Sequence, residues 1–281
     1  MNAIELINPK CKTCGTTPEV RNSKHIFIDL AKIQPQHEKF FEQEKTKWAS
    51  NAIQFTSSLL KEGLRGRCIT RDLKWGTPVP LEEYKNKVFY VWFDAPIGYL
   101  SITANYNEEN WEKWWKNPKN VELFQFMGKD NITFHTVIFP CTLLGTHENY
   151  TMLNNISTTE FLNYEVDEKT GKPKKFSKTR QTGVFGDDAM KTGIPSEVWR
   201  YYLLINRPES QDTTFLWSDL IAKNNNELLA NLGNFSNRIL KFTVSAFSSQ
   251  IPAYTGAVHP DDQKFIDQIF ELFTTYLELM E

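Results

Sequence analysis

Several features are scarce in this chain of 281 residues, and each scarcity excludes a class of protein. No apolar run approaches the ~20 residues that a bilayer-spanning helix needs, so no membrane segment is predicted. Four cysteines are too few for a disulfide framework in so long a chain. A secretory leader is not predicted either, because Pro9, Lys10 and Lys12 interrupt the first apolar stretch. We therefore expect a cytoplasmic protein.

The charge balance is close to neutral. A formal net charge of −2 gives no bulk attraction to nucleic acid, so any such contact must come from local basic patches. Aromatic residues are abundant at 14%, with 8 Trp and 20 Phe, enough to fill a large core or to line a pocket. At roughly 100–200 residues per domain, the length predicts about two domains.

Apolar patterning predicts alternating strands and helices over most of the chain. Short strands are expected at 25–30, 87–93 and 121–127, and helices at 36–62, 108–116, 196–206, from 218 onward and from Pro260. The 36–62 helix should stop at Gly63 in a left-handed conformation. Strand, helix and strand across 87–127 are typical of a βαβ unit with a parallel sheet. Ligands bind where such strands end, here at Asp94 and at Gly128.

A basic run lies within the charged loop predicted at 165–182. Five cationic residues fall within the nine positions from Lys172 to Arg180. A loop of this kind can neutralise the oxygens of a triphosphate as a phosphoryl or nucleotidyl bond breaks. From composition alone, a solvated turn or a nuclear-localisation patch is the alternative.

The centre of this run, Lys175-Phe-Ser-Lys-Thr179, resembles the Lys-Met-Ser-Lys-Ser signature of class I aminoacyl-tRNA synthetases. By that resemblance Lys178 stabilises pyrophosphate during amino-acid activation, and Lys175 and Ser177 support it. Phe176 and Thr179 depart from the commonest form of the signature, but both lysines and the central hydroxyl are retained.

The segment Trp92-Phe-Asp-Ala-Pro-Ile-Gly-Tyr99 is, taken alone, a strand that ends in an X-Pro turn. It resembles the methionine-pocket segment of methionyl-tRNA synthetases, a more specific match than the lysine loop. The resemblance implies a side-chain pocket lined by Trp92, Ala95, Pro96 and Tyr99. Aromatic rings contact a thioether sulfur favourably, by ~0.3–1.5 kcal/mol each. We expect the phenol hydroxyl to donate a weak hydrogen bond to that sulfur. A leucine or isoleucine substrate has no acceptor for this hydrogen bond.

A third segment, Phe126 to Phe139, resembles the Gly-Lys-Asp…Phe-His block of the same family. By resemblance, Gly128 and Asp130 face the ATP ribose, because a carboxylate can accept both ribose hydroxyls. The residues that complete the methionine pocket are then Asn131, His135 and Phe139. His135 is placed beside the sulfur, although a lone histidine is more often structural.

Two cysteines form a Cys-x-x-Cys pair at Cys11 and Cys14. A structural zinc site needs four ligands, so the pair alone would be two free thiols. Ile4 to Cys14 resembles the second half of the zinc knuckle in the family's connective insertion. We therefore expect zinc in the intact protein, and weak binding or none in this chain unless another ligand substitutes.

Asn234 and Arg238 are four residues apart and share one face of a predicted helix. A solvated polar face is the simpler interpretation. In the synthetase family, an Asn and an Arg at this spacing contact the anticodon, where arginine can stack on an unpaired base while the amide reads an edge.

The resemblance extends over nearly the whole chain and implies an α/β fold. It consists of the second half of a class I Rossmann-like parallel sheet, part of the connective insertion and an incomplete α-helical anticodon-binding bundle. The implied segments are the insertion with a half zinc knuckle and a long helix (1–86), the catalytic half-domain (87–182), a stem-contact region (183–217) and the anticodon-binding helices (218–281). No His-Ile-Gly-His motif occurs. We therefore expect a truncated fragment that alone catalyses little or no ATP–pyrophosphate exchange.

The implied activity is that of a methionine–tRNA ligase, with methionine, ATP and tRNA(Met) as substrates. Methionine is activated to methionyl-adenylate, with Mg²⁺ accompanying ATP, and is then transferred to tRNA. Membership of a multi-synthetase complex is compatible with this assignment, and the oligomeric state is left open. One alternative is a non-catalytic tRNA-binding module of the same fold, which would bind tRNA but not methionine. The other is a different class I synthetase, which an amino-acid binding screen would identify.

Overall fold

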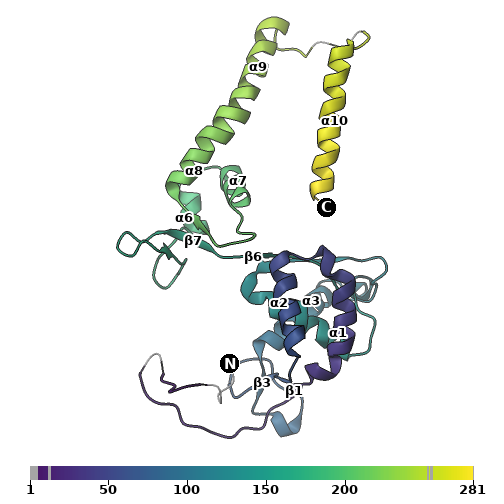
Figure 1. Cartoon of the computed structure of the whole chain (residues 1–281), viewed down its shortest axis with the longest axis vertical. Helices are drawn as coiled ribbons and strands as arrows, with labels where there is room; N and C mark the ends of the chain where they lie inside the picture. Colours follow the sequence, from purple (N-terminus) through teal and green to yellow (C-terminus); the bar gives the residue numbers. More distant parts are fainter. Residues whose placement is uncertain (1–5, 12–13, 252, 254–255, 281) are drawn as a thin grey trace. The chain divides into compact units, whose positions relative to one another are not determined.

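The computed structural model describes residues 6–11, 14–251, 253 and 256–280 (Figure 1). Ile4, Glu5, Lys12 and Thr13 of the expected zinc knuckle lie outside these residues. The chain divides into two compact units, Met1–Phe215 and Leu216–Glu281. Among the described helices, none combines the length and the apolar character that crossing a membrane requires.

The main core of the first unit is built around two helices, α1 (Leu30–Glu44) and α2 (Ser50–Glu62). A single helix was predicted here, and the structure breaks it. Trp48 is extended at φ −99° and ψ 151°, its indole N–H donates to Asn154 at 3.0 Å, and the Ala49 N–H donates to the Ile156 carbonyl at 2.9 Å. The backbone leaves the helix because it bonds to a neighbouring strand. Gly63 ends α2 with positive φ, but its ψ of 126° is not left-handed helical as predicted.

The parallel sheet of this core consists of β5 (Leu123–Gly128) and β6 (Leu153–Thr159). They are joined through η4 (Lys129–Asn131), the π-helix η5 (Phe134–Ile138) and α5 (Phe139–Gly145). The predicted βαβ unit over 87–127 is therefore wrong. Its first strand shrinks to β4 (Val88–Phe89), which pairs antiparallel with β3 (Thr70–Arg71), and α4 (Trp111–Trp115) confirms the expected Trp-rich helix.

The apolar residues after β4 form α3 (Val91–Tyr106) instead of continuing a strand. The helix begins where the N–H groups of Phe93 and Asp94 donate to the Tyr90 carbonyl, at 2.7 and 3.3 Å. A short apolar run is compatible with either a strand or a buried helix, so its pattern alone could not decide.

A second sheet has the order β8 (Pro173–Lys174), β7 (Leu162–Val166), β9 (Thr213–Phe215). The predicted loop at 165–182 is thus partly an antiparallel β7–β8 hairpin. The short helix α6 (Gly186–Lys191) follows the loop. The expected helix at 196–206 is confirmed as α7 (Ser196–Ile205), and its Trp199 stacks on Phe215 at 5.9 Å, with Tyr164 also stacked on that ring at 5.9 Å.

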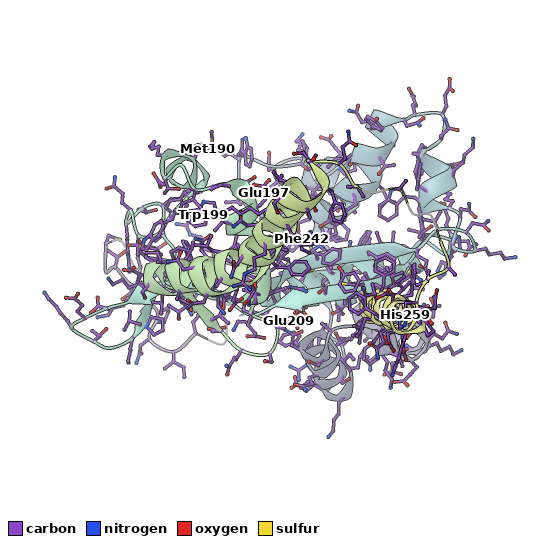
Figure 2. The ribbon with its side chains drawn as sticks, turned by 90° about the horizontal axis from the view of Figure 1, so that it is seen from above. Met190, Glu197, Trp199, Glu209, Phe242 and His259 are labelled. Atoms are coloured by element: carbon purple, nitrogen blue, oxygen red, sulfur yellow. The ribbon has the colours of Figure 1, made fainter. Side chains whose placement is uncertain are left out.

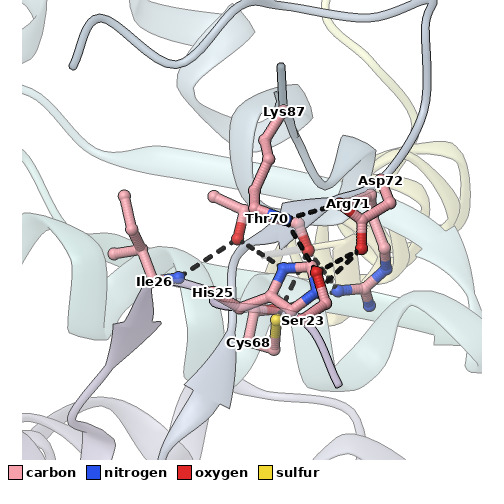
Figure 3. Close-up of polar contacts among 8 residues, drawn as sticks. All are labelled: Ser23, His25, Ile26, Cys68, Thr70, Arg71, Asp72 and Lys87. Atoms are coloured by element: carbon pink, nitrogen blue, oxygen red, sulfur yellow. Dashed lines mark hydrogen bonds and ion pairs between the residues drawn. The ribbon is translucent and has the colours of Figure 1, made fainter. Parts of the chain in front are cut away.

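The strand expected at 25–30 is β1 (Phe27–Ile28), paired with β2 (Arg67–Cys68). Polar contacts fasten the preceding residues to the end of β3 (Figure 3). Asp72 accepts from Lys87 at 2.5 Å and from Ser23 at 2.6 Å, and His25 lies 3.2 Å away. The hydrogen bonds from Lys87 and Ser23 lower the pKa of the Asp72 carboxyl to about 2. Ser23 and His25 are therefore held to the end of β3 by polar contacts at the protein surface.

The second unit contains α8 (Trp217–Lys223), the π-helix η6 (Asn224–Gly233), α9 (Asn234–Phe247) and α10 (Pro260–Met280). Helices were predicted from 218 onward and from Pro260, and these four elements confirm them. Most apolar side chains of α9 and α10 are exposed, with Phe242 (Figure 2) 62% exposed and Phe273 55% exposed, whereas Leu220 of α8 is buried. The described residues therefore show the helices of the predicted bundle without a packed bundle core.

A buried histidine in α1 gives the core a pH dependence. His37 is fully buried and donates from Nε2 to the Thr136 carbonyl at 2.6 Å, while Nδ1 has no partner among the described residues. Burial lowers the pKa of His37, although the bond to Thr136 opposes this. The unfolded state then binds the proton more readily, so stability is complete above pH ~6.5 and declines as pH falls toward the folded-state pKa.

We expect urea unfolding of the wild-type chain to show a free energy of unfolding that falls as the pH drops from about 6.5 to about 5.5, by at most ~1.4 kcal/mol per pH unit for this residue. The variant His37→Gln should show a shallower slope, whatever its absolute stability. An identical slope in both proteins would contradict the assignment of the effect to His37.

Candidate functional site

Residues from two separate sequence segments meet between α3 and η5. The Tyr99 hydroxyl lies 2.8 Å from His135 Nε2. Trp92 stacks on Phe134, with ring centroids 4.3 Å apart and planes 14° apart. The structure therefore brings the two predicted methionine-pocket segments together, with Trp92 and Tyr99 on α3 facing aromatic and imidazole rings on η5.

The hydrogen bonds fix the direction of the Tyr99–His135 contact. His135 Nδ1 lies 3.0 Å from the Asn131 carbonyl, which can only accept, so Nδ1 carries the proton. Burial lowers the pKa of His135, which favours the neutral ring. Nε2 is then an acceptor, and Tyr99 donates to it. This differs from the expectation that the phenol proton is directed to a substrate sulfur, because in this structure the imidazole holds it.

The remaining pocket residues occupy different depths. Ala95 is exposed on α3 and Pro96 is buried, while Asn131 contributes its backbone carbonyl to His135. Phe139 is 1% exposed and lies edge-on to Tyr99 at 5.9 Å, so it packs on the protein side of the Tyr99 ring. The Phe139 N–H bonds back to the Phe134 carbonyl, the five-residue spacing of a π-helix, a geometry that is frequent at functional sites.

The expected ribose-binding residues lie at the carboxyl end of β5. Asp130 is exposed in the turn η4, and its Oδ1 would lie 3.2 Å from a Cβ placed on Gly128. A side chain at 128 would therefore press on the Asp130 carboxylate unless that exposed side chain shifted by a few tenths of an ångström. A carboxylate at the end of a parallel strand is suited to accept hydrogen bonds from ribose hydroxyls.

The lysine loop is a tight turn beside the β7–β8 hairpin. Ser177 and Thr182 exchange two backbone hydrogen bonds at 2.8 and 3.0 Å, which leaves Lys178 exposed at the tip. Phe176 anchors the turn edge-on to Tyr164 at 5.3 Å. Gly183 has φ +127°, and a Cβ there would overlap the Phe176 ring. Within the described residues, no hydrogen bond or ion pair joins this loop to the Tyr99–His135 pair.

Sequence reasoning missed a cavity of about 480 Å³ whose lining includes Arg65, Arg67, Arg71 and Tyr90. The Arg71 guanidinium lies over the Tyr90 ring at 3.8 Å. In the part of the chain that is described, no carboxylate comes within ion-pair distance of these arginines. Glu62 also lines the cavity, and Arg71 donates to the Thr70 carbonyl at 2.8 Å. The alternating spacing in Arg65-Gly-Arg67 and the nearby Arg71 were the available signals. Phe134 was also missed, because only its stacking contact with Trp92 shows that it belongs to the candidate site.

The expected zinc and anticodon residues are solvent-facing. Cys11 and Cys14 are exposed, with Cys14 Sγ 3.0 Å from the Thr16 hydroxyl. No group of three candidate ligands forms among the described residues, so the donors present do not fit a four-ligand zinc site. Asn234 and Arg238 both lie on α9 with exposed side chains.

The fold has close counterparts among solved structures. A crystal structure of Mycobacterium tuberculosis methionyl-tRNA synthetase bound by methionyl-adenylate superposes with a TM-score of 0.74 and 21% identity, over 96% of this chain and 51% of that one. Its apo form gives a TM-score of 0.70 over 92% of this chain and 47% of that one. This architecture, with its parallel sheet and lysine loop, is that of a class I aminoacyl-tRNA synthetase.

The family can be stated more narrowly. The family model described as tRNA synthetases class I (M) matches residues 1–240, and the chain belongs to this family. It is 57% identical to the probable cytoplasmic methionine–tRNA ligase of Dictyostelium discoideum and 50% identical to the cytoplasmic methionine–tRNA ligase of Homo sapiens. Both matches cover the whole chain but 37% and 30% of those relatives, so the chain spans about a third of their length.

Proposed function

We propose that this chain supplies the methionine pocket and the nucleotide loop of a cytoplasmic methionine–tRNA ligase. The reaction joins methionine to ATP as methionyl-adenylate, with release of pyrophosphate, and then transfers methionine to tRNA(Met). The observation that carries the proposal is the 2.8 Å hydrogen bond from Tyr99 to His135, beside the stacked Trp92–Phe134 pair. Cytoplasmic relatives at 50–57% identity support the compartment and the activity.

In this proposal, the methionine side chain lies against Trp92, Ala95, Pro96 and Tyr99. The sulfur is polarisable, and each contact with an aromatic ring stabilises the bound side chain by ~0.3–1.5 kcal/mol. The neutral His135 fixes the phenol by accepting a hydrogen bond from its hydroxyl, so the edge of the Tyr99 ring is presented to the side chain in one orientation. Phe139 and Asn131 hold this arrangement from the protein side.

The nucleotide would be held by the β5 turn and the lysine loop. Asp130 accepts the ribose hydroxyls above Gly128, and Mg²⁺ enters with ATP as part of the substrate complex. As the methionine carboxylate attacks the α-phosphate, negative charge grows on the departing pyrophosphate. Lys178 stabilises that charge, with Lys175 and Ser177 shaping the turn. The arginine-lined cavity suits a further carboxylate or phosphate group.

The finer organisation follows the same family. We assign residues 1–86 to the connective insertion, 87–182 to the catalytic half-domain, 183–217 to the stem-contact region and 218–281 to the start of the anticodon-binding helices. On α9, Asn234 and Arg238 would contact anticodon bases. Cys11 and Cys14 would contribute to zinc binding only with ligands beyond those described. Assembly into a multi-synthetase complex is compatible with this arrangement.

The test has two arms. The protein encoded by the complete gene should catalyse methionine-dependent ATP–pyrophosphate exchange, with leucine, isoleucine and cysteine as competing substrates. The 281-residue chain should be examined separately for methionine binding by calorimetry. Exchange that depends on another amino acid would overturn the methionine assignment. Binding of tRNA by the complete protein without any exchange would identify a non-catalytic tRNA-binding module instead.

A further inference from the structure

A lysine that the proposed reaction does not use lies at a junction of three segments. Lys129, in the turn after β5, directs its ammonium to Glu160 Oε2 at 2.5 Å and to Asp212 Oδ1 at 2.8 Å. Glu160 follows β6, and Asp212 precedes β9. The Lys129 and Glu160 side chains are only 31% and 17% exposed, so this pair is better shielded than an ordinary surface ion pair.

Glu160 and Asp212 bind Lys129, and they also bind the segment that connects the two sheets. Glu160 also accepts from Asn51 on α2 at 3.1 Å, and its own N–H donates to the Pro208 carbonyl at 2.7 Å. The next residue, Phe161, donates its N–H to Asp212 Oδ1 at 3.0 Å. Residues 160 and 161 are where the chain passes from β6 to β7, so the junction fixes how the β7–β8 hairpin leaves the β5–β6 sheet.

The same junction reaches the lysine loop through one aromatic ring. Phe161 has the Lys129 ammonium 4.4 Å from its ring centroid and the Lys175 ammonium 5.2 Å away. Lys175 is the first residue of the loop that carries Lys178. A cation over an aromatic ring is attracted by its quadrupole, so both lysines are drawn to the same ring. Movement of the junction would therefore be transmitted to the base of the loop.

We propose that Lys129 is a positioning residue that, clamped by Glu160 and Asp212 and packed on Phe161, sets the lysine loop relative to the Asp130 turn. This inference rests on the proposed function, because it gives the clamp a part in amino-acid activation. It adds that Lys129, although adjacent to Asp130, does not contact ATP phosphate. Its ammonium already bonds two carboxylates, and a third anion would meet their combined negative charge.

The ionisation of the three groups agrees with this geometry. The hydrogen bonds that Lys129 donates to Asp212 and Glu160 raise the pKa of Lys129 and lower the pKa of both carboxyls. The clamp is thus fully charged at neutral pH. The chain also offers a matched control, because Lys116 binds Glu112 at 3.1 Å and Glu148 at 2.9 Å and lies near the Trp111 and Tyr150 rings. This second clamp has the same chemistry without a link to the lysine loop.

The positional part of the proposal can be tested without activity. Spin labels introduced as unnatural amino acids at Lys61 on α2 and at Thr179 in the loop report the distance between the sheet body and the loop. We expect the Lys129→Met variant to broaden or shift that distance distribution. Lys129→Arg should restore the wild-type distribution, and Lys116→Met should leave it unchanged. A wild-type distribution in Lys129→Met would overturn the proposal.

The catalytic part is tested by a double-mutant cycle in the protein encoded by the complete gene. Lys129→Met should lower the kcat of ATP–pyrophosphate exchange by about 100-fold, as expected for a displacement of ~1 Å, with the methionine KM nearly unchanged. In a Lys178→Ala background, Lys129→Met should cause little further loss, because the group that it positions is gone. Fully additive losses would overturn the positioning role. If the wild-type protein shows no exchange at all, the proposed function fails, and the label distances still decide whether Lys129 holds the loop.

Discussion

Replacing Lys178 with alanine is expected to lower the kcat of methionine-dependent ATP–pyrophosphate exchange by about 10²–10³-fold. Lys178 stands exposed at the tip of the Ser177–Thr182 turn, where its ammonium has no carboxylate within ion-pair distance among the described residues. In the proposed reaction, its charge is therefore free to stabilise the pyrophosphate as it departs. Because that charge develops mainly in the transition state, kcat should fall more than the affinity for ATP. Steady-state exchange kinetics with varied ATP measure both quantities.

Lys169→Ala is the matched control for this variant. Lys169 is an exposed lysine in the turn between β7 and β8, so its removal changes the net charge equally without touching the loop tip. Its exchange kinetics should remain at the wild-type level. If Lys178→Ala instead raised the ATP KM at constant kcat, Lys178 would bind ATP equally in the ground state and the transition state. That result would refute the proposed transition-state role.

Replacing His135 with leucine is expected to lower kcat/KM for methionine by about 10–100-fold, while the ATP KM stays nearly constant. The substitution removes the acceptor of the Tyr99 hydroxyl and leaves that hydroxyl and the Asn131 carbonyl without their protein partner. In the proposed pocket, the phenol ring then loses its fixed orientation against the methionine side chain. Exchange kinetics with varied methionine provide the measurement, and calorimetric methionine binding gives the affinity directly.

Two further variants make the result specific. Tyr99→Phe keeps the ring and removes one hydroxyl, so its loss should be smaller than that of His135→Leu. His147→Asn changes an exposed histidine outside the pocket and should have no effect on methionine kinetics. Near-UV circular dichroism checks that the buried position tolerates leucine. Equal losses for methionine and ATP in a folded His135→Leu protein would show a general disturbance of the site and refute a methionine-specific role.

Much of the candidate site could be predicted from local sequence, but its geometry could not. The segments around Trp92 and His135 were identified by resemblance, and the structure brings them together. Their secondary structure was partly mispredicted, because Trp92 and Tyr99 lie on α3 and not at a strand end. Only the pairing of β3 with β4 shows where the short strand stops and the helix begins.

The amino-acid sequence by itself determined the family, the helix that became α7, the helical periodicity of α9 and α10, and which side chains are candidates for the proposed pocket and loop. Those properties depend on side-chain identity and on spacings of three or four residues, which can be recognised within a short stretch of sequence. The tertiary structure decided that β5 pairs with β6, that Tyr99 donates to His135, and that Lys129 joins Glu160 to Asp212. These outcomes depend on contacts between residues about 30 to 80 positions apart. No local pattern encodes such a contact, because its partners are selected only when the whole chain packs.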